Sequence, residues 1–159
     1  PQVGRAHVEL DMPTATAGAT YSARLRITHG CKGSPTTGVS VAMPEGVQGV
    51  RPMPKPGWVV DATTEKLPKP YEFHGRKITE EVTRVRWSGG RLASAHYDEF
   101  SILMRLPATA GKLYFKVIQT CEQGAIEWTQ IPAPGRNVHD YPEPAAELDV
   151  APAANRHSH

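Results

Sequence analysis

Histidines at the ends of strand-like segments are the part of this sequence that could do chemistry. His29 follows an alternating segment and lies two residues before Cys31, in the glycine-rich loop 29–38. A second histidine, His7, opens the first alternating segment. An imidazole at a strand end can bind a metal ion, because the strand fixes the ring while the loop leaves one side open. His7 and His29 are therefore candidate metal ligands.

Two acidic residues could complete such a site. Asp98 and Glu99 stand immediately before the apolar segment 100–106, and carboxylates are common metal ligands. Simpler interpretations remain open for every candidate. His7 could be an exposed strand residue, His29 could bond only to the backbone, and the acidic pair could be a solvated strand start.

The motifs of common enzyme classes are absent from the sequence. It contains no Gly-x-Ser-x-Gly elbow, no phosphate-binding glycine-rich loop ahead of a helix and no His-Glu-x-x-His pair. Cys31 and His29 could be imagined as a nucleophile and its base, but a cysteine held in a disulfide cannot attack a substrate. We therefore expect that the protein is not an enzyme.

The chain has two cysteines, Cys31 and Cys121, both at the ends of strand-like segments. Two lone cysteines in a small β-rich chain are typical of a disulfide formed in an oxidising compartment. Two unrelated free thiols are the alternative. The two residues are too far apart in sequence for a Cys-x-x-Cys zinc motif.

Length and charge restrict the class of protein further. The chain has 159 residues, enough for one domain with a hydrophobic core, and its net charge is +2. The basic residues are scattered along the chain, so we expect no nucleic-acid partner. No apolar run reaches the roughly 20 residues that a membrane-spanning helix requires. The oligomeric state is left open.

Period-two alternation indicates an all-β chain. Tyr21, Ala23, Leu25 and Ile27 alternate with polar residues, and similar segments recur at roughly 8–12 residues, up to residue 131. No segment has the apolar stripe of a helix, and the Ser-Gly-Gly sequence at 88–90 predicts a turn. About nine short strands at this spacing predict an immunoglobulin-like β-sandwich.

Composition divides the chain into three parts. Residues 1–6 are interpreted as a leader remnant or added cloning residues, with small residues at Gly4 and Ala6 that resemble a signal-peptide cleavage site before His7. Residues 7–132 form the predicted sandwich domain. Residues 133–159 are rich in proline and alanine, which predicts a flexible tail in which 146–150 could add one edge strand.

Six motifs in order resemble the bacterial YcnI-like copper-binding domain. They span nearly the whole of the expected domain, from His7 to about Ile131. The motifs are HVEL (7–10), SPTT (34–37) leading to MPEGV (43–47), PKPGW (54–58), WSGG (87–90), DEF (98–100) and EWT (127–129).

The resemblance implies an extracytoplasmic β-sandwich that binds Cu(II) at a mononuclear site. In that family the first histidine of the mature chain is thought to supply its α-amine and a ring nitrogen, while an acidic side chain and a tryptophan complete or cover the site. Here His7 fits the first role and Trp128 the covering role. Glu99 is the candidate acidic ligand, with Asp98 beside it. The loop after the second strand has no carboxylate, and His29 stands near that place.

The cysteines bear on this site as well. A bond between Cys31 and Cys121 would bring His29 toward the end of the sandwich that bears Trp128, because Cys121 stands just before that strand. An amine and an imidazole on one residue form a chelate, and nitrogen ligands in tetragonal geometry favour Cu(II).

These inferences predict a copper-binding protein for copper storage, delivery or homeostasis. The expected partners are the copper ion and, beyond it, another periplasmic copper chaperone or a membrane copper transporter. The expected location is periplasmic or otherwise extracytoplasmic, by secretion through a signal peptide, with membrane association as an option. The alternative function is a metal-free β-sandwich module for adhesion or assembly.

Overall fold

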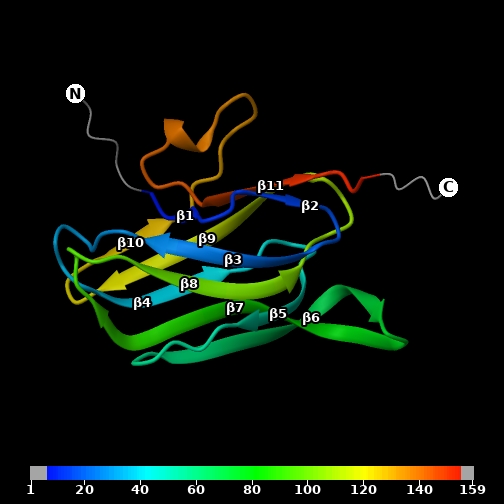
Figure 1. Cartoon of the computed structure of the whole chain (residues 1–159), viewed down its shortest axis with the longest axis horizontal. Helices are drawn as coiled ribbons and strands as arrows, with labels where there is room; N and C mark the ends of the chain where they lie inside the picture. Colours follow the sequence, from blue (N-terminus) through cyan, green and yellow to red (C-terminus); the bar gives the residue numbers. More distant parts are fainter. Residues whose placement is uncertain (1–6, 155–159) are drawn as a thin grey trace.

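The computed structural model describes residues 7–154 and confirms an all-β sandwich (Figure 1). Within this range the chain forms eleven strands in two sheets and one short 3-10 turn, η1 (Val138–Asp140), with no α-helix. The interpretation of residues 1–6 as a leader remnant lies outside the described residues, as do the last five residues of the predicted tail.

The smaller sheet is antiparallel and contains the first alternating segments of the chain. Its register places Glu9 opposite Arg26 and Arg26 opposite Glu99. In spatial order its strands are β1 (Glu9–Leu10), β3 (Thr20–Ile27), β8 (Asp98–Arg105) and β5 (Gln48–Pro52).

The larger sheet is mixed, because its strand β11 pairs parallel with β2 and antiparallel with β9. Strand β10 (Ala125–Trp128) turns back from β9 and pairs with its second half, beside the part of β9 that pairs with β11. In order the strands of this sheet are β2 (Thr14–Thr16), β11 (Ala146–Ala151), β9 (Gly111–Cys121), β4 (Thr36–Ala42), β7 (Arg76–Leu92) and β6 (Val59–Phe73).

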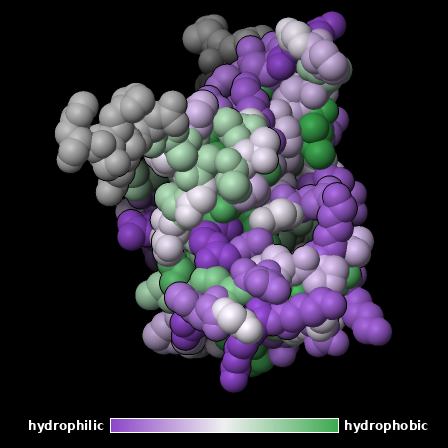
Figure 2. All heavy atoms as spheres, turned by 90° about the vertical axis from the view of Figure 1, so that its right-hand side faces the viewer, coloured by the Kyte–Doolittle hydropathy of each residue, from purple (hydrophilic) through white to green (hydrophobic). Residues whose placement is uncertain are grey.

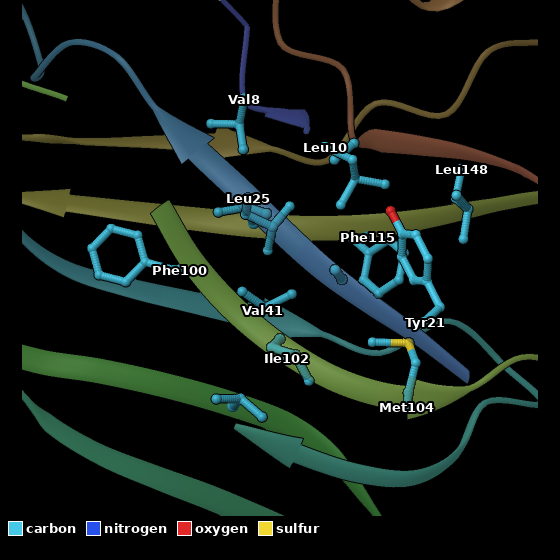
Figure 3. Close-up of a cluster of buried hydrophobic side chains, with 14 of the residues drawn as sticks. Val8, Leu10, Tyr21, Leu25, Val41, Phe100, Ile102, Met104, Phe115 and Leu148 are labelled. Carbon is cyan, nitrogen blue, oxygen red and sulfur yellow. The ribbon is translucent and has the colours of Figure 1, made fainter. Parts of the chain in front are cut away.

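The core lies between the two sheets and follows the alternation of the sequence. Strand β3 buries Tyr21, Ala23, Leu25 and Ile27 and turns the intervening residues outward, as predicted. Side chains from β8, β9 and β11 meet them between the sheets (Figure 3). Packing of these inward faces makes the sandwich one cooperative unit.

Strands β6 and β7 form a long hairpin whose tip is His74 and Gly75. The predicted turn at 88–90 is wrong, since these residues lie inside β7. Gly90 is needed there because the Trp58 indole packs against its backbone, and a Cβ atom on Gly90 would lie 2.1 Å from the indole. The face at the hairpin side of the molecule is mainly hydrophilic, with scattered apolar residues (Figure 2).

The sandwich extends past the predicted boundary at residue 132. Strand β11 lies between β2 and β9, where Leu148 is fully buried, so it is not an edge strand. The segment between β10 and β11 is a closed loop rather than a tail. Two of its bonds join the ends: the amide of Ala145 donates to the carbonyl of Gln130, and the amide of Glu143 donates to the side chain of Gln130.

Cys31 and Cys121 form the predicted disulfide, with Cα atoms 6.0 Å apart. The bond joins the loop after β3 to the end of β9, and so links the two sheets. A search for spanning helices in residues 7–154 finds none long and apolar enough to cross a membrane.

Candidate metal centre

The antiparallel pairing of β1 with β3 brings two of the predicted ligands to one end of the sandwich. His7 lies two residues before β1, and His29 lies two residues after β3. Because Glu9 is paired with Arg26, the start of β1 lies beside the end of β3. Both imidazoles are half-buried.

Trp128, the last residue of β10, lies close to both histidines. Its ring centroid is 6.0 Å from that of His7 and 6.0 Å from that of His29. The indole is only 3% exposed, so it forms the floor beneath the imidazoles. The expected approach of His29 toward Trp128 is confirmed.

The His29 ring is oriented by a backbone carbonyl. Its Nδ1 atom lies 2.7 Å from the oxygen of Gly30, which can only accept a hydrogen bond. Nδ1 therefore carries the proton of the neutral ring, and Nε2 carries the lone pair. His29 therefore bonds to the backbone, and this bond fixes the tautomer in which Nε2 can bind a metal ion.

A buried glutamine holds the floor of this region. Gln119 on β9 is completely buried, and its side-chain nitrogen donates to the carbonyl of His29 at 2.7 Å and to the Thr36 hydroxyl at 2.8 Å. Its side-chain oxygen accepts the Nε1 proton of Trp128 at 3.0 Å. One amide therefore fixes both the tryptophan and the backbone of His29.

A third histidine, which the sequence reasoning missed, stands over His7. The rings of His7 and His139 have centroids 6.4 Å apart and planes only 19° apart. His139 lies in η1, within the segment interpreted as a tail. The signal that could have found it is the Asn-x-x-Asp spacing of residues 137–140, which is typical of a capped turn. We call His7, His29, Trp128 and His139 the histidine cluster.

The predicted acidic ligands start β8, on the opposite side of β3 from β1, and are engaged with cations. The Asp98 carboxylate accepts from Lys55 at 2.7 Å, and the Glu99 carboxylate accepts from Arg26 at 3.2 Å. The hydrogen bond to Glu99 is the main reason that the pKa of the Arg26 guanidinium lies above its usual value. We call Lys55, Arg26, Asp98 and Glu99 the acidic cluster.

The predicted ligand set of His7, His29 and Glu99 does not form one site. Residues 7–154 contain no group of three or more His, Cys, Asp or Glu side chains placed to hold a metal ion. The histidine cluster provides imidazole nitrogens next to the Trp128 indole. Imidazole nitrogen is a donor that suits copper, nickel or zinc. Two imidazoles leave room for a main-chain donor.

Comparisons with known proteins place the fold and the family. An uncharacterized protein from Nocardia farcinica, described as having an immunoglobulin-like fold, superposes with a TM-score of 0.67 at 24% identity, over 91% of this chain and 98% of that chain. At this identity the likeness shows the fold alone. Among curated proteins none matches the chain. Residues 7–150 match a protein family described as "Domain of unknown function (DUF1775)", so the chain belongs to the DUF1775 family.

Proposed function

We propose that this chain is an extracytoplasmic copper-binding protein of the YcnI-like type, which holds Cu(II) at a mononuclear site built on His7. The observation that carries the proposal is the placement of His7 and His29, each 6.0 Å from the buried indole of Trp128. The fold brings together residues that stand far apart in the sequence, and two of the three are metal-ligand types.

The donor set favours Cu(II) over other divalent ions. Imidazole and amine nitrogens in a tetragonal arrangement bind Cu(II) most tightly among first-row divalent metals. Since residues 7–154 supply no cluster of three ligand side chains, tight binding requires a further donor from the main chain. The α-amine of His7 supplies it once the chain is cleaved between Ala6 and His7. Bound copper would then be held for storage or delivery.

The disulfide supports a location outside the cytoplasm. Such bonds persist in oxidising compartments and are rare where thiols are kept reduced. The Cys31–Cys121 bond joins the loop of His29 to the strand that precedes β10, so the same oxidation that marks the compartment also assembles the proposed site.

The test compares two forms of the chain, one beginning at His7 and one retaining residues 1–6. Each is titrated with Cu(II) by calorimetry, and the loaded protein is studied by electron paramagnetic resonance. We expect one Cu(II) per chain in the form beginning at His7, with nitrogen hyperfine structure, and weaker binding in the extended form because its amine is in a peptide bond.

Variants of single histidines provide the control. His7→Ala in the form that begins at residue 7 keeps the amine but loses the ring, and it is expected to lose the tight site. His74→Ala removes an imidazole at the hairpin tip and should leave binding unchanged. Equal copper binding by His7→Ala and the unsubstituted chain would overturn the proposal and favour the metal-free module.

A further inference from the structure

We propose that His139 is a further imidazole ligand of the same ion, in addition to His7 and His29, carried by the loop 130–145, so that the ion is held between His7 and this loop. The inference rests on the proposed function and adds a ligand to it. It also gives a role to a segment whose composition alone predicts a tail.

The ring geometry suits two ligands on one ion. With metal–nitrogen bonds of about 2.0–2.1 Å, two imidazoles on one ion have ring centroids roughly 4.5–6.4 Å apart, depending on the angle between them. The 6.4 Å separation of the His7 and His139 rings lies at the upper end of this range, which corresponds to rings on opposite sides of the ion. The ring planes are 19° apart and stacked, so the exposed His139 ring must rotate for a nitrogen of each ring to face the ion.

A cavity joins the two rings. His7 and His139 line a space of about 210 Å³ between β1, η1 and the start of β11, large enough for an ion and bound water. The loop rises over β1 in Figure 1.

Glu147, a carboxylate of this cavity, already has partners. It accepts from Tyr114 at 3.1 Å and pairs with Lys112 at 3.5 Å. Burial, and then the hydrogen bond to Glu147, raises the pKa of Tyr114 to about 12, so the phenol remains a donor to Glu147 well into alkaline pH. Glu147 is therefore engaged, and Glu9, the other carboxylate that lines the cavity, is exposed to solvent, so the proposal rests on the two imidazoles.

The turn that carries His139 is built to hold its place. The Asn137 side chain accepts from the His139 amide at 2.8 Å, and the Asp140 side chain accepts from the Asn137 amide at 3.0 Å, which is a reciprocal capping box. The Tyr141 hydroxyl accepts from the Ala133 amide across the loop at 2.9 Å. Because these bonds fix the backbone without using the His139 ring, metal binding has to order only the side chain of His139 and not the turn.

The experiment uses the form that begins at His7 and the Cu(II) ion alone. His139→Gln, His29→Gln and the hairpin-tip control His74→Gln are compared with the unsubstituted chain by competition titration and by pulsed electron paramagnetic resonance, which counts coupled imidazoles. We expect His139→Gln to weaken Cu(II) binding by about tenfold or more and to remove one coupled imidazole. The His74→Gln variant should do neither.

Two further measurements separate a ligand from a structural residue. His139 is exposed, so His139→Gln should leave the melting temperature of the metal-free protein unchanged while reducing the rise caused by Cu(II). Asn137→Ala, which loosens the turn but keeps the ring, should weaken binding by less than His139→Gln. If His139→Gln keeps the affinity and the coupled imidazoles while His7→Ala loses binding, the inference is wrong and the proposed function stands. If the unsubstituted chain binds no copper, both are wrong.

Discussion

The histidine cluster and the acidic cluster are two polar regions of one sandwich, and they are built on different principles. In the acidic cluster the carboxylates of Asp98 and Glu99 each meet a cation, at partly exposed positions. In the histidine cluster two imidazoles lie beside a buried indole, a third lies against His7, and a buried amide holds the indole and the backbone of His29. In the acidic cluster, negative carboxylates are paired with positive side chains. In the histidine cluster, hydrogen bonds hold the His29 imidazole and the indole in fixed orientations.

The two clusters differ in how strongly the surrounding structure fixes their side chains. Ion pairs at half-exposed positions contribute about 0–1 kcal/mol each, so the acidic cluster could be rearranged at little cost. Around the histidine cluster stand a disulfide and the fully buried side chain of Gln119, whose loss costs more. A carboxylate next to a strand is therefore a weaker indicator of a ligand than an imidazole fixed by such neighbours.

Removing the disulfide should have the largest effect on this contrast. Cys31→Ser combined with Cys121→Ser opens a link between residues 90 apart in sequence, and we expect a loss of about 2–5 kcal/mol in the free energy of unfolding, measured with urea. Copper binding should weaken as well, because the loop of His29 loses its tether. A loss below about 1 kcal/mol with unchanged copper affinity would mean that the bond does not organise the site.

Replacing Gln119 should have the next largest effect. Gln119→Leu leaves the Nε1 proton of Trp128 and the carbonyl of His29 without their buried partner, which should cost about 2–3 kcal/mol of stability. Trp128 fluorescence should change, because the indole loses its hydrogen bond. Gln123→Leu, at an exposed position in the turn after β9, is the matched control and should change stability by less than about 0.5 kcal/mol. Similar losses of stability in the two variants would contradict the view that the buried side chain of Gln119 stabilises the site.

Alternation located most of the fold because a strand buried on one face must repeat every two residues. The alternation pattern gave a wrong prediction where a residue makes a contact with a distant part of the chain, because the local sequence does not reveal that contact. Gly90 looks like part of a turn, yet it lies in a strand because the Trp58 indole needs its space. Segment 146–150 is predicted as an edge strand within a tail, yet β11 lies between β2 and β9 because of a long-range pairing.

The same limit applies to the candidate site. His7, His29 and Trp128 could be predicted from their positions at strand ends and from the family resemblance. For His139 the Asn-x-x-Asp spacing indicates a capped turn, but its approach to His7 could not be predicted, because that depends on how the loop 130–145 closes. Glu99 was expected as a ligand because a carboxylate near a strand start is a ligand type, but the register of β3 and β8 places Arg26 opposite it.

Replacing Glu99 should have the smallest effect, and it directly compares the acidic cluster with the histidine cluster. Glu99→Gln removes one of the two carboxylates that pair with Arg26, the other being Asp11, but keeps the shape of the side chain, so the free energy of unfolding should fall by about 0–1 kcal/mol. Copper affinity of the form beginning at His7 should stay within about twofold, whereas loss of a ligand should cost tenfold or more. His139→Gln, measured in the same titration, gives the size of a ligand's effect. If Glu99→Gln weakens copper binding as much as His139→Gln does, Glu99 must leave Arg26 when the metal binds. The acidic cluster would then be a reserve of ligands for the histidine cluster, and the division between the two regions would hold only for the metal-free protein.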